Sequence, residues 1–72
     1  MKDFATNTKV SWKWGEGHGM GYIREKFTER VVREIDSNEV VRDADEENPA
    51  YLIEQDDGQE LLKSASELEK AS

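Results

Sequence analysis

Four aromatic residues are the strongest candidates for a binding site in this sequence: Trp12, Trp14, Tyr22 and Tyr51. Aromatic rings attract a basic or methylated side chain when several ring faces surround the cation. A supporting carboxylate would come from one of three acids, Glu16, Glu54 and Asp56. The alternative is that the rings only fill the core, since each can bury about 150–250 Å² of surface. A plain peptide groove that uses the same rings is a third interpretation.

Other chemistries lack a complete set of residues. His18 is the only histidine and there is no cysteine, so the ligands of a usual zinc site are missing. As a general base, His18 would need a positioned partner and a pocket, and its glycine-rich surroundings favour a solvated loop residue. The glycines at alternate positions from 15 to 21 lack the following helix that a phosphate loop requires. The acidic run at 43–47 lacks the glycine of a calcium loop. The sequence therefore predicts no catalytic residue, no cofactor and no metal site.

Length and charge restrict the classes of partner. The 72 residues allow one domain, and the net charge of −7 opposes binding to nucleic acids and to anionic membranes. No apolar run reaches the roughly 20 residues that span a bilayer. With no cysteine and no N-terminal segment of signal-peptide type, we expect a cytoplasmic protein. A local basic stripe that could still contact nucleic acid would comprise Lys9, Lys13, Arg24, Lys26, Arg30 and Arg33.

The first half of the chain predicts two strands. Residues 9–14 alternate, with Val10, Trp12 and Trp14 on one face. The glycine-rich stretch 15–19 predicts a loop, and residues 20–28 predict a long strand with Ile23 and Phe27 on one face. A glycine at position 21 of this strand indicates a bulge or the close approach of another backbone.

Residues 29–44 are ambiguous between a helix and a hairpin. Their charges would suit a helix, but the β-branched residues and the turn cluster at 36–38 favour a hairpin that pairs 30–35 with 39–43. Arginines and glutamates of the two strands would then form cross-strand charge pairs on the wet face.

The C-terminal half predicts a second hairpin and a helical turn. Asp57 and Gly58 form a turn between the strands 51–55 and 59–63. We expect a single turn after residue 64, with Ser66 as its N-cap and Leu68 closing the open end of the sheet. Residues 1–8 are predicted to be a flexible arm from which Phe4 docks on a domain of residues 9–70. Together these elements predict an all-β barrel of about five strands.

Two segments, VSWKWG at 10–15 and PAYLIEQDDG followed by LLKSASELEK at 49–70, resemble the hypervirulence-associated Tudor domain family of small bacterial and fungal proteins. The resemblance implies an SH3-like barrel of the Tudor or chromo-barrel kind, with no catalytic residues and no cofactor. The chain departs from the family pattern before Lys9, where residues 6–8 replace an expected Gly-Asp turn. Some Tudor domains bind methylated lysine or arginine in an aromatic cage, a property that a fold does not carry by itself.

The sequence thus predicts a non-enzymatic binding module for a peptide or protein segment, either basic or methylated, at one end of the barrel. The alternatives are a structural or stress-related protein that self-associates or joins a larger complex, and weak nucleic-acid binding through the basic stripe. A strand edge within 30–43 is where a partner strand would add. The sequence fits a monomer or a weak homo-oligomer.

Overall fold

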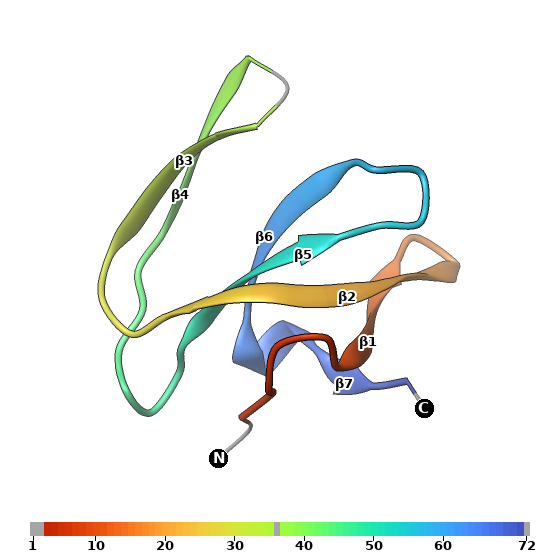
Figure 1. The fold of residues 1–72 in the computed structure, drawn as a ribbon, viewed down its shortest axis with the longest axis horizontal. Coiled ribbons are helices and arrows are strands. Elements are labelled where there is room, and N and C mark those ends of the chain that lie inside the picture. Colours follow the sequence, from red (N-terminus) through yellow and green to blue (C-terminus); the bar gives the residue numbers. More distant parts are fainter. Residues whose placement is uncertain (1–2, 36, 72) are drawn as a thin grey trace.

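The structure is a computed structural model, which describes residues 3–35 and 37–71. The described residues form seven strands and one 3₁₀ turn: β1 (Lys9–Trp14), β2 (Gly17–Phe27), β3 (Val31–Ile35), β4 (Asn38–Arg42), β5 (Ala50–Glu54), β6 (Glu60–Ser64), η1 (Ala65–Glu67) and β7 (Glu69–Lys70). Five strands form an antiparallel sheet in the order β6-β5-β2-β1-β7, and β3 and β4 form a separate two-stranded sheet (Figure 1). The predicted all-β class is confirmed. The predicted closure of the barrel is wrong for the described part of the chain, because β6 and β7 remain edge strands.

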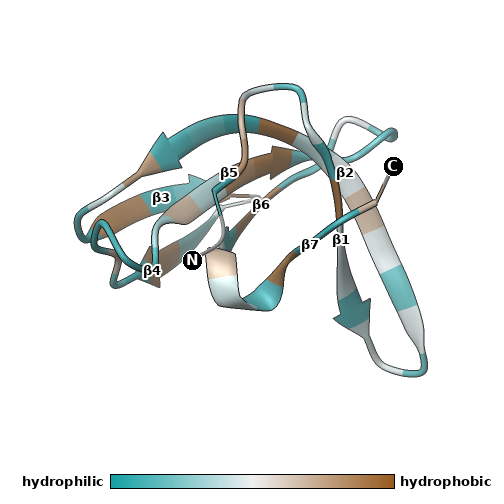
Figure 2. Ribbon diagram, turned by 90° about the horizontal axis from the view of Figure 1, so that it is seen from below, coloured by the Kyte–Doolittle hydropathy of each residue, from teal (hydrophilic) through white to brown (hydrophobic). Residues whose placement is uncertain are grey.

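The core is divided into two clusters by strand β5. Tyr51 and Ile53 point into a cluster on the concave side of the curled sheet, whose other buried members are Val10, Trp12, Ile23, Ala65 and Leu68. Ala50 and Leu52 point the other way, into a cluster with Leu62 and Val31. Figure 2 shows the resulting concentration of hydrophobic residues in β5 and the strands beside it. Because β5 is buried on both faces, its sequence is a continuous apolar run rather than an alternating one.

A bulge in β2 directs its two halves into different clusters. The pairing with β5 shifts between Ile23 and Glu25. As a result Ile23 lies in the concave cluster, whereas Phe27 packs against the second cluster. Strict alternation would place both on one face, so that prediction is wrong. The close approach predicted at Gly21 is confirmed, since a Cβ there would lie 2.8 Å from the carbonyl oxygen of Glu54.

The two tight hairpins of the main sheet depend on glycines with positive φ. Gly15, with φ of 56°, begins a turn of only two residues between Trp14 and Gly17, so the predicted loop over 15–19 is wrong and most of it belongs to β2. The glycine at 58 has φ of 85° in the turn between β5 and β6, as predicted. Asp57 stabilises that turn, because its Oδ1 accepts a hydrogen bond from the Gln59 backbone N–H at 3.0 Å.

The hairpin predicted for residues 30–43 is confirmed as β3 and β4. Of the predicted cross-strand charge pairs, Arg30 and Asp43 form one at the base of the hairpin, at 3.6 Å. The rest of the prediction is wrong, since Glu34 lies opposite Glu39 and Arg33 lies opposite Val40. Arg33 instead forms an ion pair of 2.8 Å with Glu25 of β2. The odd-numbered positions of β3 face the second cluster, which turns this arginine towards β2 and away from its own hairpin.

The C-terminal helical turn is confirmed, with a different cap. Ser64 rather than Ser66 is the N-cap, and its backbone N–H donates to Glu67 Oε1 at 2.9 Å. Leu68 follows the turn and is completely buried in the concave cluster, as predicted. The chain then continues into β7, which pairs with β1 at Val10 and Ser11. A strand of two residues has no periodicity from which the sequence could predict it.

The segment before β1 contacts the sheet. Phe4 packs against the concave cluster, as expected, and residues 1–2 of the predicted arm lie outside the described residues. Asn7 has φ of 73°, a left-handed conformation that asparagine adopts more readily than most residues other than glycine. Its backbone N–H donates to the carbonyl of Ile23 at 2.7 Å, which fixes the entry into β1.

Candidate functional site

The faces of the β1–β2 ribbon separate the four aromatic candidates. Directly opposed residues of antiparallel strands share a face. Trp12 lies opposite Gly19 and Trp14 opposite Gly17, on the concave face, whereas Tyr22 lies opposite Lys9 on the outer face. The structure therefore brings the two tryptophans together and leaves Tyr22 on the other side of the ribbon.

Tyr51 is a core residue with no exposed surface. Its hydroxyl donates to Asp3 Oδ1 at 3.1 Å and accepts the backbone N–H of Phe4 at 3.0 Å. The Phe4 ring packs edge-on against it, with the ring centroids 5.5 Å apart. Burial raises the pKa of the tyrosine hydroxyl. The two residues that cover this ring come from the segment before β1, where the sequence has no periodicity that would predict a contact.

The tryptophans line a hollow of about 410 Å³ between the tips of two hairpins. One wall is the β1–β2 hairpin and the other is the β5–β6 hairpin; the tips lie side by side in Figure 1. Trp12 is 5% exposed and covers Gly19, whereas Trp14 is 72% exposed at the mouth. We call this space the tip hollow; its lining residues are Trp12, Trp14, Gly19, Gln55, Asp57, Gln59, Leu61 and Lys63.

The wall opposite the tryptophans is polar with an apolar patch. Gln55 and Gln59 carry amide groups, Asp57 carries a carboxylate, and Leu61 packs against the concave cluster. The ammonium group of Lys63 lies 3.6 Å from the carboxylate of Glu67, which also lies 3.8 Å from the Arg42 guanidinium. Asp57 is thus the carboxylate of the hollow without a cationic partner among the described residues. The sequence contains no local signal for this wall, because only the curling of the sheet brings the β5–β6 turn to the tryptophans.

None of the three predicted acids lines the tip hollow. Glu54 shares the outer face with Tyr22 and forms an ion pair of 2.7 Å with Arg24. Glu16 and Asp56 are exposed in the two hairpin turns that adjoin the hollow. The latter two remain candidates for contact with a ligand that extends beyond the hollow.

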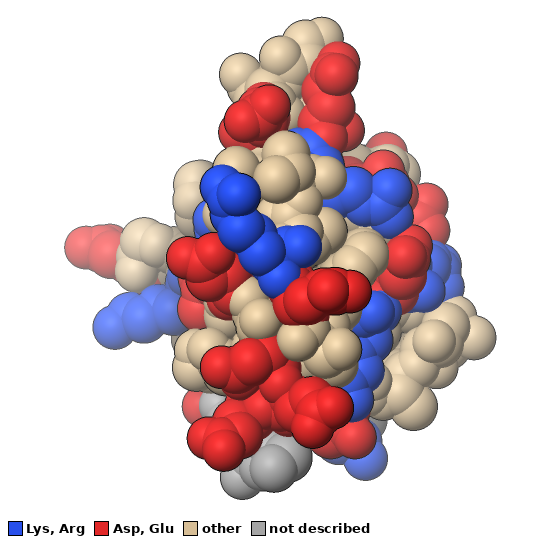
Figure 3. Space-filling model, turned by 90° about the vertical axis from the view of Figure 1, so that its left-hand side faces the viewer, with Lys and Arg blue, Asp and Glu red and all other residues tan. Residues whose placement is uncertain are grey.

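Ion pairs occupy most of the predicted basic stripe. Arg24, Lys26, Arg30 and Arg33 each lie within 4 Å of a carboxylate, on Glu54, Asp3, Asp43 and Glu25 respectively. Lys9 and Lys13 are the members of the stripe for which the described residues provide no ion pair. Figure 3 shows the same mixture on the side of the β3–β4 hairpin, where basic and acidic side chains alternate above a cluster of acids. A continuous cationic surface for a phosphate backbone is therefore missing from the described part of the chain.

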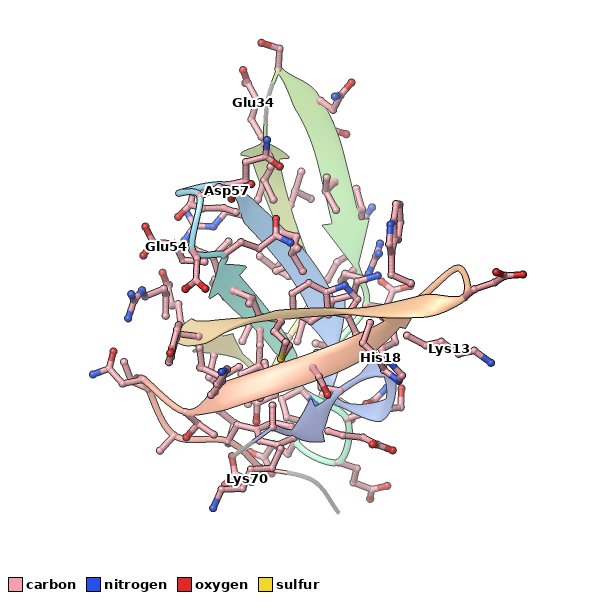
Figure 4. All side chains as sticks on the ribbon, turned by 90° about the vertical axis from the view of Figure 1, so that its right-hand side faces the viewer. Lys13, His18, Glu34, Glu54, Asp57 and Lys70 are labelled. Carbon is pink, nitrogen blue, oxygen red and sulfur yellow. The ribbon has the colours of Figure 1, made fainter. Side chains whose placement is uncertain are left out.

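A smaller hollow of about 190 Å³ lies at the outer edge of β1, lined partly by Lys13, His18, Glu67 and Glu69. Figure 4 shows Lys13 and His18 on the side of the β1–β2 ribbon away from Asp57. Within the described ranges, no three histidine or acidic side chains are grouped so that they could hold a metal ion. The same ranges contain no helix long and apolar enough to cross a membrane.

Comparison with protein families assigns this small, all-β domain to a family. The family model of the hypervirulence-associated proteins' Tudor domain matches residues 8–68, which is most of the chain. The chain belongs to this Tudor domain family. Tudor domains are small binding modules that generally bind peptides or proteins, and the family is not an enzymatic one. A search of curated proteins and a search of solved structures found no match to this Tudor domain.

Proposed function

We propose that this Tudor domain binds an extended protein segment whose side chain enters the tip hollow. The observation that carries the proposal is the exposure of Trp14, which is 72% accessible at the mouth of a hollow of about 410 Å³. A large exposed indole beside a concave surface is the usual composition of a binding hot spot. Pockets of this kind in proteins commonly have volumes of about 300–1,000 Å³.

The lining favours a cationic side chain, either lysine or its methylated form. The Trp14 ring provides an aromatic face, and Asp57 on the opposite wall provides a negative charge. The amides of Gln55 and Gln59 can pair with the backbone of an extended segment, since each has a donor and an acceptor. The net charge of −7 would attract a basic segment from a distance.

Methylation should affect the affinity less than in a closed cage. The hollow offers one exposed ring and the edge of a second, because Trp12 is only 5% exposed. A cage discriminates methylammonium by surrounding it with several ring faces. We therefore propose a groove that reads a basic side chain in an extended segment and prefers the methylated form only weakly.

The proposal is tested by amide chemical-shift titration with three peptides of one sequence that carry lysine, trimethyl-lysine or glutamate at the central position. Lysine and trimethyl-lysine peptides should shift the amides around Trp14 and Asp57, and the glutamate peptide should not. Trp14→Ala should remove the shifts. Met20→Ala is the matched control, since Met20 is also exposed but lies on the outer face. Shifts that are absent at millimolar peptide, or that survive Trp14→Ala, would contradict the proposal.

A further inference from the structure

Two exposed apolar residues lie outside the tip hollow, and each stands in a charged surface. The large hydrophobic residues that are exposed in the described chain are Trp14, Met20 and Val32. Trp14 belongs to the tip hollow, whereas Met20 and Val32, which are 51% and 48% exposed, are not among its lining residues. The side chains around Met20 and those around Val32 carry opposite charges, and this difference indicates what could cover each residue.

Met20 is the centre of a basic surface on the outer face of the β1–β2 ribbon. It lies opposite Ser11, between the pairs Lys9–Tyr22 and Lys13–His18. No described carboxylate forms an ion pair with either lysine. Glu54, next to Tyr22, is neutralised by Arg24. The acids beside the two lysines are Glu69 of β7, opposite Ser11, and Glu67, which lines the smaller hollow with Lys13 and is itself paired with Lys63 and Arg42. We call this the basic face; its members on β1 and β2 are Lys9, Ser11, Lys13, His18, Met20 and Tyr22.

Val32 is the centre of an acidic surface on the outer face of the β3–β4 hairpin. It lies opposite Val41, and the next pair on this face is Glu34 with Glu39. Two carboxylates directly opposite each other destabilise a sheet, and no described cation forms an ion pair with either one. At the base of the hairpin the charges of Arg30 and Asp43 cancel at 3.6 Å. We call this the acidic face; its members are Val32, Glu34, Glu39 and Val41.

We infer that the acidic face of one copy of this chain docks on the basic face of a second copy. Each face has an apolar centre with charges beside it, and the charges are opposite. Contact would cover Met20 and Val32 and bring lysines to the opposed Glu34 and Glu39. Figure 4 shows Glu34 near the tip of the hairpin, far from Lys13 and His18, so one molecule cannot bring its own two faces together.

The two faces are different surfaces, so the contact is head-to-tail. Such contacts give closed rings or open chains rather than a dimer with one self-complementary patch. The average mass in solution should therefore rise past that of a dimer as the concentration increases. The tip hollow is on neither face, so the association is independent of the proposed peptide binding.

Charge exchange tests the proposal by sedimentation equilibrium and light scattering at millimolar protein and low ionic strength. The wild-type mass should exceed the monomer mass and fall towards it as salt is added, because salt screens exposed charges. Glu34→Lys with Glu39→Lys should abolish association, as should Lys9→Glu with Lys13→Glu. In an equimolar mixture, the unchanged basic face of one variant can dock on the unchanged acidic face of the other, and the two charge-exchanged faces are also complementary. The mixture should therefore regain the wild-type mass. Glu69→Gln, which removes an acid from the basic face, should strengthen association.

Three outcomes would overturn the proposal: a wild-type protein that stays monomeric, association that persists in both double variants, or a mixture that stays monomeric when the wild type associates. Circular dichroism of each variant separates loss of association from loss of folding. If a double variant unfolds, Lys9→Gln with Lys13→Gln and Glu34→Gln with Glu39→Gln replace it, and each should still lower the average mass. Trp14→Ala is the matched control, since it should abolish peptide binding and leave the mass unchanged.

Discussion

The indole of Trp12 lies directly over Gly19, its cross-strand partner on β2. A Cβ at position 19 would overlap Cε2, Nε1 and Cζ2 of the ring. Because Gly19 has no side chain, the Trp12 ring can lie against β2, between the concave cluster and the tip hollow.

Gly19→Ala should displace this ring. We expect a loss of about 1–3 kcal/mol in the free energy of unfolding, the usual effect of overpacking. Chemical denaturation measures the loss, and the change in tryptophan emission reports movement of the ring. Gly17→Ala is the control, since a Cβ there meets only the Trp14 carbonyl oxygen at 3.8 Å. Equal stability of the two variants would show that Trp12 shifts without strain.

Leu68→Ala should lower the free energy of unfolding more than Trp14→Ala or Met20→Ala, which remove exposed side chains of the β1–β2 ribbon. Leu68 is completely buried, and such a truncation costs about 2–5 kcal/mol. Trp14→Ala and Met20→Ala should change stability by about 0.5 kcal/mol or less, as is typical of surface positions. Thermal unfolding of the three variants compares them directly. A Trp14→Ala variant as unstable as Leu68→Ala would mean that Trp14 is part of the core.

Asp3 should stabilise the fold at neutral pH and not at strongly acidic pH. Lys26, which donates to it at 2.7 Å, and the Tyr51 hydroxyl lower the pKa of this carboxyl below its ordinary value of 3.8. A group with a lowered pKa in the folded state contributes stability above its ordinary pKa, and this contribution disappears as the pH falls through the folded value. Asp3→Asn should therefore be less stable than wild type at pH 7, and the two unfolding curves should converge in acid. A difference that persists in strong acid would point to packing rather than charge.

Tyr51 should give a second pH dependence, in alkali. Burial raises its pKa above the ordinary value of 10.0, so the folded state favours the neutral hydroxyl. Its contribution is complete below pH 10.0 and is lost as the pH rises through the folded pKa. Tyr51→Phe should cost about 1 kcal/mol at pH 7, because a buried hydrogen bond is lost. Between neutral and alkaline pH, the free energy of unfolding should fall less in this variant than in wild type, as measured by circular dichroism.

Arg33 should attach the β3–β4 hairpin to the main sheet. Its guanidinium pairs with Glu25 at 2.8 Å and lies 5.3 Å from the centre of the Phe27 ring. We expect Arg33→Ala to cost about 1 kcal/mol, the sum of a surface ion pair and a cation–π contact. Arg30→Ala is the control, since its ion pair with Asp43 is longer, at 3.6 Å, and more exposed. Amide hydrogen exchange in β3 and β4 should accelerate in Arg33→Ala and not in Arg30→Ala. Equal exchange rates in the two variants would show that Arg33 does not attach the hairpin to the main sheet.

Local signals in the sequence were sufficient for much of the fold. The alternation of residues 9–14 predicted the face shared by Val10, Trp12 and Trp14, of which the first two are buried, and the Asp-Gly turn predicted the β5–β6 hairpin. The β-branched pairs and the turn residues of 29–44 correctly indicated a hairpin rather than a helix. These features depend on residues close together in the chain, where side-chain type and backbone conformation are directly linked.

The errors arose where distant segments decide the outcome. The β2 bulge, which separates Ile23 from Phe27, follows from the fit of β2 to β5. Tyr51 is buried because residues 3–4 cover it. For the candidate site, the sequence predicted Trp12 and Trp14, which line the tip hollow, but Gln55, Asp57 and Gln59 join them only through the curl of the sheet. Spacing along the chain contains no information on that curl.

The β2 bulge also bears on how this domain can evolve. Strand β2 contributes residues to both core clusters. The gain or loss of one residue between Ile23 and Phe27 would therefore exchange inner and outer positions in half of the strand. Lys26 would then enter an apolar layer and Phe27 would meet water. We expect descendants of this gene to keep the length of that segment fixed, while insertions accumulate at the hairpin tips, where recognition can diversify without turning either interior outward.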